Sequence, residues 1–341
     1  MVKNKIIYTI LSFIISIALI WYLLSHIEIE DLFKIFSQIY YPFLLIFIII
    51  SLIAAYLRAL RYKWLLGQHH ITWGNIFLAT FIRNLFVDLF PARIGSLSYV
   101  YVLNRRMDFP FEIATSTFVL SFLLDFLTLS PFVIFSIFLV GIGSIALPGF
   151  SLIIFAFMLF ILLLIIFWKL VPISYLILKV YQFLLKIFKL EDKKWAKISI
   201  NKILLTIDDL ILIKKRKIFW HVFSISFGMR LAKYGSLYFL LFSLLHSYGF
   251  SLENLSFWKT TLGITGAEFT SILPVKGIGG FGTWEAGWAL SFKLMDFDPN
   301  LAILSGISVH LITNIFEYSL GIFSILILAF LSNKKIKRPR N

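Results

Sequence analysis

Long hydrophobic stretches without a charged residue, separated by short polar segments, dominate the chain. A single crossing of a bilayer needs about 20 apolar residues, so a stretch of this kind predicts a membrane-spanning helix. Residues 126–168 hold enough for two helices, and the break at 141–149 divides them. We predict six crossings, over about residues 6–24, 39–57, 112–140, 149–168, 218–246 and 299–331. The first is longer than the apolar core of a signal peptide and is expected to be retained.

Two further hydrophobic pieces, about 74–104 and 258–293, are interrupted by proline, glycine and charged residues. Irregular backbone at membrane depth survives only where protein or a watery cavity satisfies its polar groups, so both pieces are expected to line a site as re-entrant hairpins. Each has a carboxylate-bearing helical half followed by a proline, a cation and glycine: Pro91-Ala-Arg93-Ile-Gly95 in the first and Pro274-Val-Lys276-Gly277 in the second.

The predicted topology brings these two hairpins in from opposite sides of the membrane. Opposite entry is typical of an inverted repeat, here with halves of about 1–168 and 217–331, and such repeats place a site near the midplane. On this interpretation Arg93 and Lys276 approach one cavity. The alternative is two unrelated interfacial loops that happen to carry proline and glycine.

Composition supports an all-α, polytopic membrane helix bundle that forms one integral domain over residues 1–341. Hydrophobic residues make up 60% of the chain, charged residues 14%, and mean hydropathy is +0.92. The net charge of +15 comes from basic residues beside the hydrophobic stretches, which is the positive-inside pattern rather than a nucleic-acid surface. That pattern places both termini in the cytoplasm. The chain has no cysteine, which excludes disulfides and thiolate metal sites.

The basic segment 169–217 is predicted to lie in the cytoplasm as an amphipathic interfacial helix. Polar residues recur every three or four positions between apolar ones, at Lys179, Gln182, Lys186, Lys189 and Lys193. Such a helix senses anionic lipids or docks a cytoplasmic synthase. A solvated basic loop is the simpler alternative.

Four motifs, in order along the chain, resemble the transmembrane, flippase-like region of lysylphosphatidylglycerol synthases and the stand-alone membrane proteins grouped with it. They are Arg58-Ala-Leu-Arg61-Tyr-Lys-Trp64, Asn84 followed by Pro91-Ala-Arg93-Ile-Gly95, Leu123-Leu-Asp125, and Gly279-Gly280-Phe-Gly282-Thr-Trp-Glu285. The chain departs from the family at Phe122 and His310, where relatives often carry arginine. The resemblance implies a prokaryotic plasma-membrane protein that has the lipid-translocating part without the synthase domain.

Ionisable side chains inside membrane helices are costly and usually face a cavity or pair with one another. A cation beside glycines and a helix N-terminus suits a phosphate group, which makes the two broken pieces candidate head-group sites. The spacing also puts Arg230 and Lys233 on one helix face and His310, Asn314 and Glu317 on another. Substrate-binding candidates are Asn84, Asp88, Arg93, Gly95, Asp125, Arg230, Glu268, Lys276, Gly279, Gly280, Gly282, Glu285 and Glu317. The alternative is that the charges pair structurally, for instance Asp125 with Arg230, and that the glycines only pack.

The sequence therefore predicts a transporter that moves an anionic phospholipid or a polyprenyl-phosphate intermediate between leaflets. Soluble-type catalytic and nucleotide-binding motifs are absent from the sequence, and no cofactor or metal is expected. Two alternatives remain. One is a membrane-embedded enzyme that modifies a lipid head group, with Glu268, Glu285 or His310 as acid or base. The other is a scaffold for a cytoplasmic lipid synthase.

Overall fold

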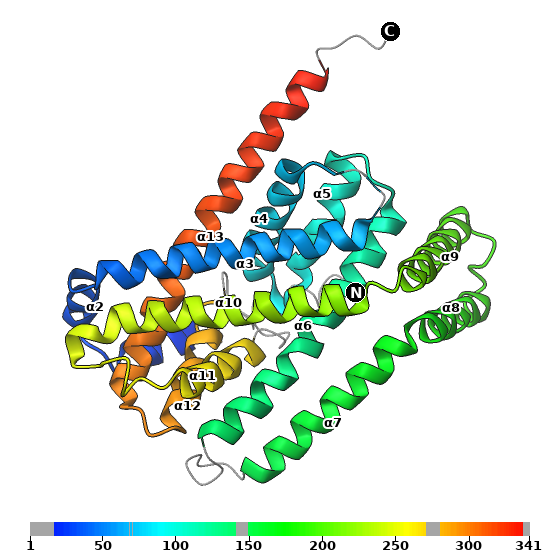
Figure 1. The fold of residues 1–341 in the computed structure, drawn as a ribbon. Coiled ribbons are helices and arrows are strands. Elements are labelled where there is room, and N and C mark those ends of the chain that lie inside the picture. Colours follow the sequence, from blue (N-terminus) through cyan, green and yellow to red (C-terminus); the bar gives the residue numbers. More distant parts are fainter. Residues whose placement is uncertain (1–16, 68, 70, 141–148, 271–279, 337–341) are drawn as a thin grey trace.

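The computed structural model describes residues 17–336 apart from 68, 70, 141–148 and 271–279, and this part of the chain is all helical (Figure 1). Residues 17–24 form a helix that precedes the labelled ones. The helices that follow are α2 (Ile29–Ser37), α3 (Tyr41–Leu66), α4 (Trp73–Leu89), η1 (Pro91–Leu97), α5 (Ser98–Arg106), α6 (Phe111–Val140), α7 (Gly149–Trp168), α8 (Leu170–Ile187), α9 (Lys194–Lys215), α10 (Phe219–Leu245), η3 (His246–Tyr248), α11 (Phe257–Thr270), α12 (Thr283–Lys293) and α13 (Pro299–Ile336).

The predicted crossings from residue 39 onward lie in helices, which confirms a polytopic helical bundle. Of the first predicted crossing, at 6–24, residues 6–16 lie outside the described part of the chain. Length and composition make α3, α6, α8 and residues 299–331 of α13 able to cross a membrane. In α7 the apolar part is shorter, over Ile153–Trp168. The main difference from the sequence prediction is in α3, which does not end near Leu57 but continues through the basic residues to Leu66.

Both interrupted pieces are broken helical hairpins, as the proline and glycine pattern predicts. In the first, α4 ends before Pro91, η1 forms a tight turn, and α5 returns to pack on α4. Proline favours such a break because it cannot donate the next backbone hydrogen bond. In the second, α11 and α12 pack on each other, and Gly282 at φ 89° precedes α12. Residues 271–279 between them, including Lys276 and Gly279, lie outside the described part of the chain.

The two hairpins occupy matching positions in the bundle. Helix α3 lies beside α10 and runs antiparallel to it along the whole molecule, as the blue and yellow-green ribbons of Figure 1 show. The hairpin helix α4 packs on α13, the last long helix, while α11 packs on α6, the long helix that follows the first hairpin. Each hairpin thus rests against the long helix that follows the other hairpin in the chain.

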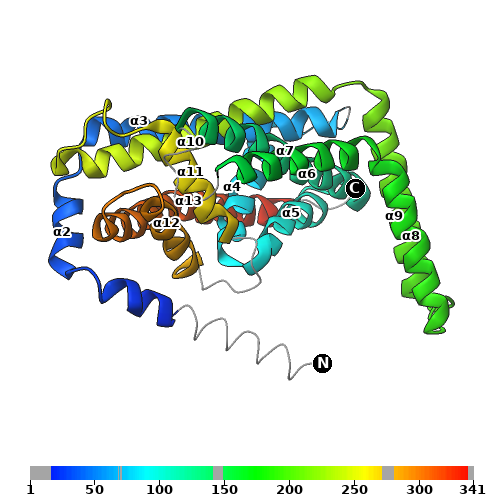
Figure 2. The same ribbon diagram turned by 90° about the horizontal axis from the view of Figure 1, so that it is seen from below.

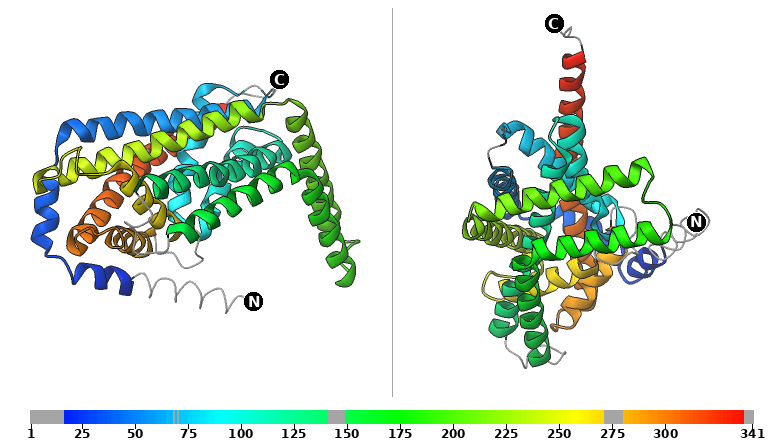
Figure 3. Two further views of the ribbon diagram at one scale, coloured as in Figure 1. Left: turned by 60° about the horizontal axis from the view of Figure 1, so that its bottom comes forward. Right: turned by 90° about the vertical axis from the view of Figure 1, so that its right-hand side faces the viewer.

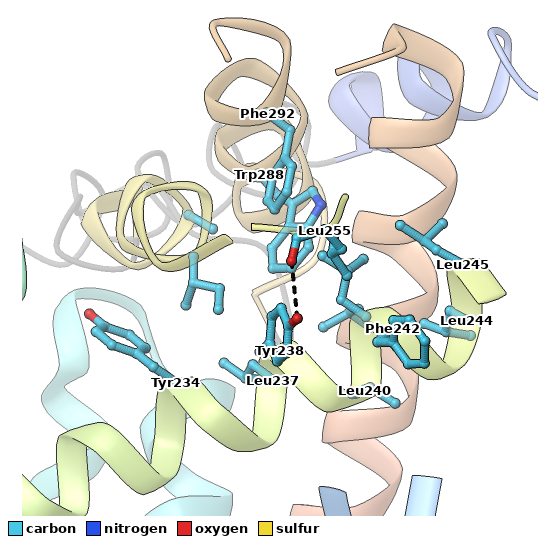
Figure 4. Close-up of a cluster of buried hydrophobic side chains, with 14 of the residues drawn as sticks. Tyr234, Leu237, Tyr238, Leu240, Phe242, Leu244, Leu245, Leu255, Trp288 and Phe292 are labelled. Carbon is cyan, nitrogen blue, oxygen red and sulfur yellow. Dashed lines mark hydrogen bonds between the residues drawn. The ribbon is translucent and has the colours of Figure 1, made fainter. Parts of the chain in front are cut away.

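Aromatic and aliphatic side chains fill the space between α10, α12 and α13. Trp288 is fully buried there and its indole Nε1 donates to the Ser305 hydroxyl at 3.2 Å. Figure 4 shows the same region, where the Tyr238 hydroxyl donates to the Leu255 carbonyl at 3.0 Å. Because this indole N–H and this hydroxyl are hydrogen-bonded, both side chains can be buried in an apolar core without an unsatisfied donor. This packing fixes α12 and α13, which carry part of the site described below.

Close packing of η1 on α4 depends on Gly95. A Cβ built at this position would lie 1.6 Å from the Phe86 carbonyl oxygen, a backbone atom that cannot move aside. We therefore expect Gly95→Ala to lower the free energy of unfolding by at least about 3 kcal/mol, the upper end of ordinary overpacking costs. Gly235→Ala in α10 is the matched control because nothing lies within 4 Å of its added Cβ.

Thermal unfolding of the purified variants in detergent measures this effect. The control is expected to keep or raise stability, since alanine favours a helix by up to about 1 kcal/mol over glycine. A Gly95→Ala protein as stable as Gly235→Ala would show that η1 can move away from α4.

Helices α8 and α9 form a hairpin that projects from one end of the bundle. In Figures 2 and 3 this hairpin runs across the direction of the long helices and extends beyond them. It is tied to the bundle by polar contacts. The Arg216 guanidinium donates to the carbonyls of Trp64 and Leu65 at the end of α3, the latter at 2.9 Å, and the Ser116 hydroxyl of α6 donates to Asp209 of α9.

Candidate functional site

A charged cavity of about 150 Å³ lies where the hairpins meet the long helices. Its lining comes from α3, α4, η1, α6, α10, α11, α12 and α13. The charged lining residues are Arg58, Arg83, Asp88, Arg93, Asp125, Arg230, Lys233, Glu268 and Glu317. This volume has room for several water molecules or a small anionic group but not for a whole lipid.

Three arginines from two helices surround the carboxylate of Asp125 on α6. Arg61 donates to it at 2.7 Å, while the guanidinium groups of Arg58 and Arg83 lie 3.9 and 3.8 Å away. Arg61 is fully buried and also contacts the Ser226 hydroxyl at 3.2 Å. One carboxylate cannot neutralise three guanidinium groups, so this cluster keeps a surplus of positive charge beside the cavity.

A second cluster gathers around Glu268 on α11. Arg230 donates to its carboxylate at 3.1 Å, and Lys233 forms an ion pair with it. Both cations lie on one face of α10, which confirms the prediction that Arg230 and Lys233 share a helix face. Arg230 also donates to the backbone carbonyl of Asp125 and so bridges the two clusters.

Glu285 and His310 form a buried pair at the inner end of α12. The carboxylate of Glu285 accepts from the Gly282 N–H at 2.7 Å and lies 2.5 Å from Nδ1 of His310. The rings of Trp284 and Phe281 flank the imidazole at centroid distances of 4.6 and 4.7 Å. Glu285 thus caps the positive end of α12, as expected of a carboxylate in that position, and holds His310 at the edge of the cavity.

Arg93 reaches the cavity from an unusual backbone conformation. Its φ is 57°, in the left-handed region that non-glycine residues seldom occupy. Asp108, Lys189, Lys217 and Asp296 have a similar φ and none of them lines the cavity. The place of Arg93 in the lining, and not its backbone conformation, therefore keeps it a candidate for contact with a ligand.

The structure brings seven of the predicted site residues together in the cavity lining. These are Asn84, Asp88, Arg93, Asp125, Arg230, Glu268 and Glu317. Glu285 lies behind the lining, where it contacts His310. Gly95 packs on α4, and Gly280 and Gly282 form the turn before α12, so these three glycines lie outside the lining. Lys276 and Gly279 lie outside the described residues, and the prediction that Lys276 shares this cavity stays a prediction.

Sequence reasoning missed the role of Arg58 and Arg61. The predicted crossing at 39–57 ends just before them, but α3 continues past them and turns both toward Asp125. Their spacing of three on a helix was the available signal. The suggested pairing of Asp125 with Arg230 is corrected as well. The Asp125 carboxylate pairs with Arg61, whereas Arg230 pairs with Glu268.

The predicted polar face of α13 is present. His310, Asn314 and Glu317 all line the cavity, together with Thr313. The described residues contain no group of three or more histidine, aspartate or glutamate side chains placed to hold a metal ion. The site is therefore defined by paired and surplus charges inside an apolar bundle.

Comparison with known proteins agrees with this architecture. The family model described as "Lysylphosphatidylglycerol synthase TM region" matches residues 9–321, which include every described residue of the cavity lining. No curated protein and no solved structure matches at a significant level. The match covers nearly the whole chain and identifies a membrane protein. The chain belongs to the lysylphosphatidylglycerol synthase TM-region family.

Proposed function

We propose that this protein moves an anionic lipid between the leaflets of a prokaryotic plasma membrane, with both termini in the cytoplasm. The substrate is a phospholipid or a polyprenyl-phosphate intermediate whose phosphate enters the charged cavity. The observation that carries the proposal is the surplus of cations there. Arginine and lysine outnumber aspartate and glutamate by five to four in the described lining, and Arg61 adds a further cation behind Asp125.

Unused hydrogen-bond donors support an anionic ligand. The Nε atoms of Arg61, Arg83 and Arg230 are buried and have no partner among the described residues. A buried donor without a partner costs free energy, and a phosphate oxygen or an ordered water would remove that cost. Arginine suits this task because its planar guanidinium matches phosphate geometry.

Apolar grooves beside the two hairpins offer room for acyl chains. One of about 470 Å³ lies between α4, α5 and α13, and another of about 260 Å³ lies between α6, α7, α11 and α12. Helix α4 therefore has a polar side, with Asn84 and Asp88 toward the cavity, and an apolar side, with Ile82 and Phe86 toward the groove. A lipid whose phosphate occupies the cavity can keep its tails in such a groove.

The matching positions of the two hairpins support inverted repeats with halves of about 1–168 and 217–331. In such repeats a fixed central site is exposed alternately to the two sides as one half rocks against the other. The antiparallel pair α3 and α10 is the contact along which the halves would move.

Reconstitution into liposomes tests the proposal. We expect labelled phosphatidylglycerol or a labelled polyprenyl phosphate to exchange between leaflets faster than in empty vesicles, and Arg93→Ala to abolish most of the gain. Arg105→Ala is the matched control because Arg105 is exposed at the end of α5 and does not line the cavity. Exchange no faster than in empty vesicles for every lipid, or equal loss in both variants, would refute the proposal.

A head-group-modifying enzyme is the second candidate, because the Glu285–His310 pair resembles a general acid–base pair and His310 borders the cavity. Lipid mass spectrometry of a deletion strain separates the two. A lipid species that disappears favours the enzyme. An unchanged lipid inventory with altered distribution between leaflets favours the transporter.

A further inference from the structure

One side of α8 is a hydrophobic surface that the described chain does not cover. Its residues are Leu176, Ile177, Val180, Phe183, Leu184 and Ile187, and each is between 44% and 63% exposed. We call this set the apolar stripe. The inner side of α8 is separate from it, since Leu178 and Leu185 are 4% exposed and the Tyr181 hydroxyl contacts Ser199 of α9 at 2.8 Å. The apolar stripe is therefore not the face that packs on α9.

A polar stripe runs beside the apolar one. Lys179, Gln182 and Lys186 are all exposed. Phe183 follows Lys179 by four residues and precedes Lys186 by three, so both lysines lie beside it along one edge of the apolar stripe. A helix with a hydrophobic strip bordered by lysines is typical of one that lies in a membrane interface. In that position the lysines meet lipid phosphates and the hydrophobic side chains enter the acyl region.

The orientation of α8 fits an in-plane position rather than a crossing. By length and composition alone α8 could span a membrane. However, α7 already runs along α6 within the bundle, and α8 then turns away from it and out of the bundle (Figures 2 and 3). The contacts of Arg216 with the end of α3 and of Asp209 with Ser116 hold the hairpin in this orientation.

We propose that the α8–α9 hairpin is a lipid-binding surface separate from the central cavity, on which α8 lies in the head-group layer of a leaflet rich in anionic phospholipid. The occupant is the membrane surface itself. Charge supports this choice, because the stripe is bordered by lysines and by no acidic residue of α8. The hairpin contacts α3 and α6, which carry Arg61 and Asp125. Binding of the hairpin to the membrane surface therefore also restrains the movement of these two helices of the cavity.

The absence of cysteine from the chain gives a direct test, because any introduced cysteine is unique. The full chain is placed in nanodiscs with Val180→Cys on the apolar stripe or Gln182→Cys on the polar stripe. With phosphatidylglycerol we expect a water-soluble maleimide to label Val180→Cys about tenfold more slowly than Gln182→Cys, since lipid covers only the apolar stripe. Equal rates at the two positions would overturn the proposal and leave the stripe as a docking surface for a protein.

The part played by anionic lipid is tested by charge reversal. Lys179→Glu with Lys186→Glu is expected to raise the Val180→Cys labelling rate toward that measured in phosphatidylcholine nanodiscs. Lys34→Glu with Lys293→Glu makes the same change in charge on exposed lysines of α2 and α12, at the opposite end of the bundle, and is expected to leave the rate unchanged. Protection equal in both lipids, or protection that depends on two copies per disc, would overturn the proposal. No transport is measured, so this test and that of the transporter succeed or fail separately.

Discussion

Replacing Asp125 with alanine is expected to lower the free energy of unfolding by about 3–5 kcal/mol, the usual cost of leaving buried charges without their partner. Asp125 is 6% exposed and is the carboxylate nearest to three guanidinium groups, with Arg61 at 2.7 Å and Arg58 and Arg83 just under 4 Å. Its loss would leave these cations to repel one another inside an apolar bundle. Equilibrium unfolding of the purified variant in mixed micelles measures the effect.

The matched control is Asp192→Ala at an exposed ion pair. Asp192 lies 3.2 Å from Lys197, and its side chain is 92% exposed. Solvent screens such a pair, so its removal is expected to cost less than about 1 kcal/mol. Equal effects of the two substitutions would show that water enters the Asp125 cluster and that the cluster does not hold the helices together.

The hydrophobic pattern was sufficient to predict most of the helices and both breaks. The ends of α6 and α7 lie within a residue of those predicted, because the uncharged run and its glycine-rich break leave little choice of boundary. The pattern failed at the end of α3, because the uncharged stretch stops at residue 57 whereas the helix continues to Leu66. A basic residue ends a membrane span only when it faces water or lipid head groups, and Arg61 faces neither because it is fully buried beside Asp125.

Which charges pair could not be read from the sequence. Helical spacing correctly grouped Arg230 with Lys233, since neighbours on one helix are fixed by geometry. It could not decide whether Arg230 faces Asp125 or Glu268, because that depends on how α10 is rotated against α6 and α11. Gly95 shows the same limit. Its sequence context allowed both ligand contact and close packing, and only the position of the Phe86 carbonyl favours packing.

Neutralising Glu268 is expected to tighten binding of an anionic lipid and to slow its translocation. Glu268 pairs with Arg230 at 3.1 Å and with Lys233, so Glu268→Gln makes both cations more available to a phosphate in the cavity. A gain of about 1.4 kcal/mol would correspond to a tenfold lower Kd. A substrate that binds more tightly at rest leaves more slowly, because passage requires binding weak enough for release. Competition binding of short-chain phosphatidylglycerol and leaflet exchange in liposomes measure the two effects.

Glu112→Gln is the control for this substitution, because Glu112 also pairs with a lysine, Lys202 at 4.0 Å, but does not line the cavity. It is expected to change neither binding nor exchange. Weaker binding of lipid by Glu268→Gln would contradict the expected tighter binding. It would mean that the Glu268 carboxylate itself binds the substrate, which requires a positive charge on the head group in addition to its phosphate. The sign of this one effect therefore distinguishes a purely anionic lipid from one that carries an amine.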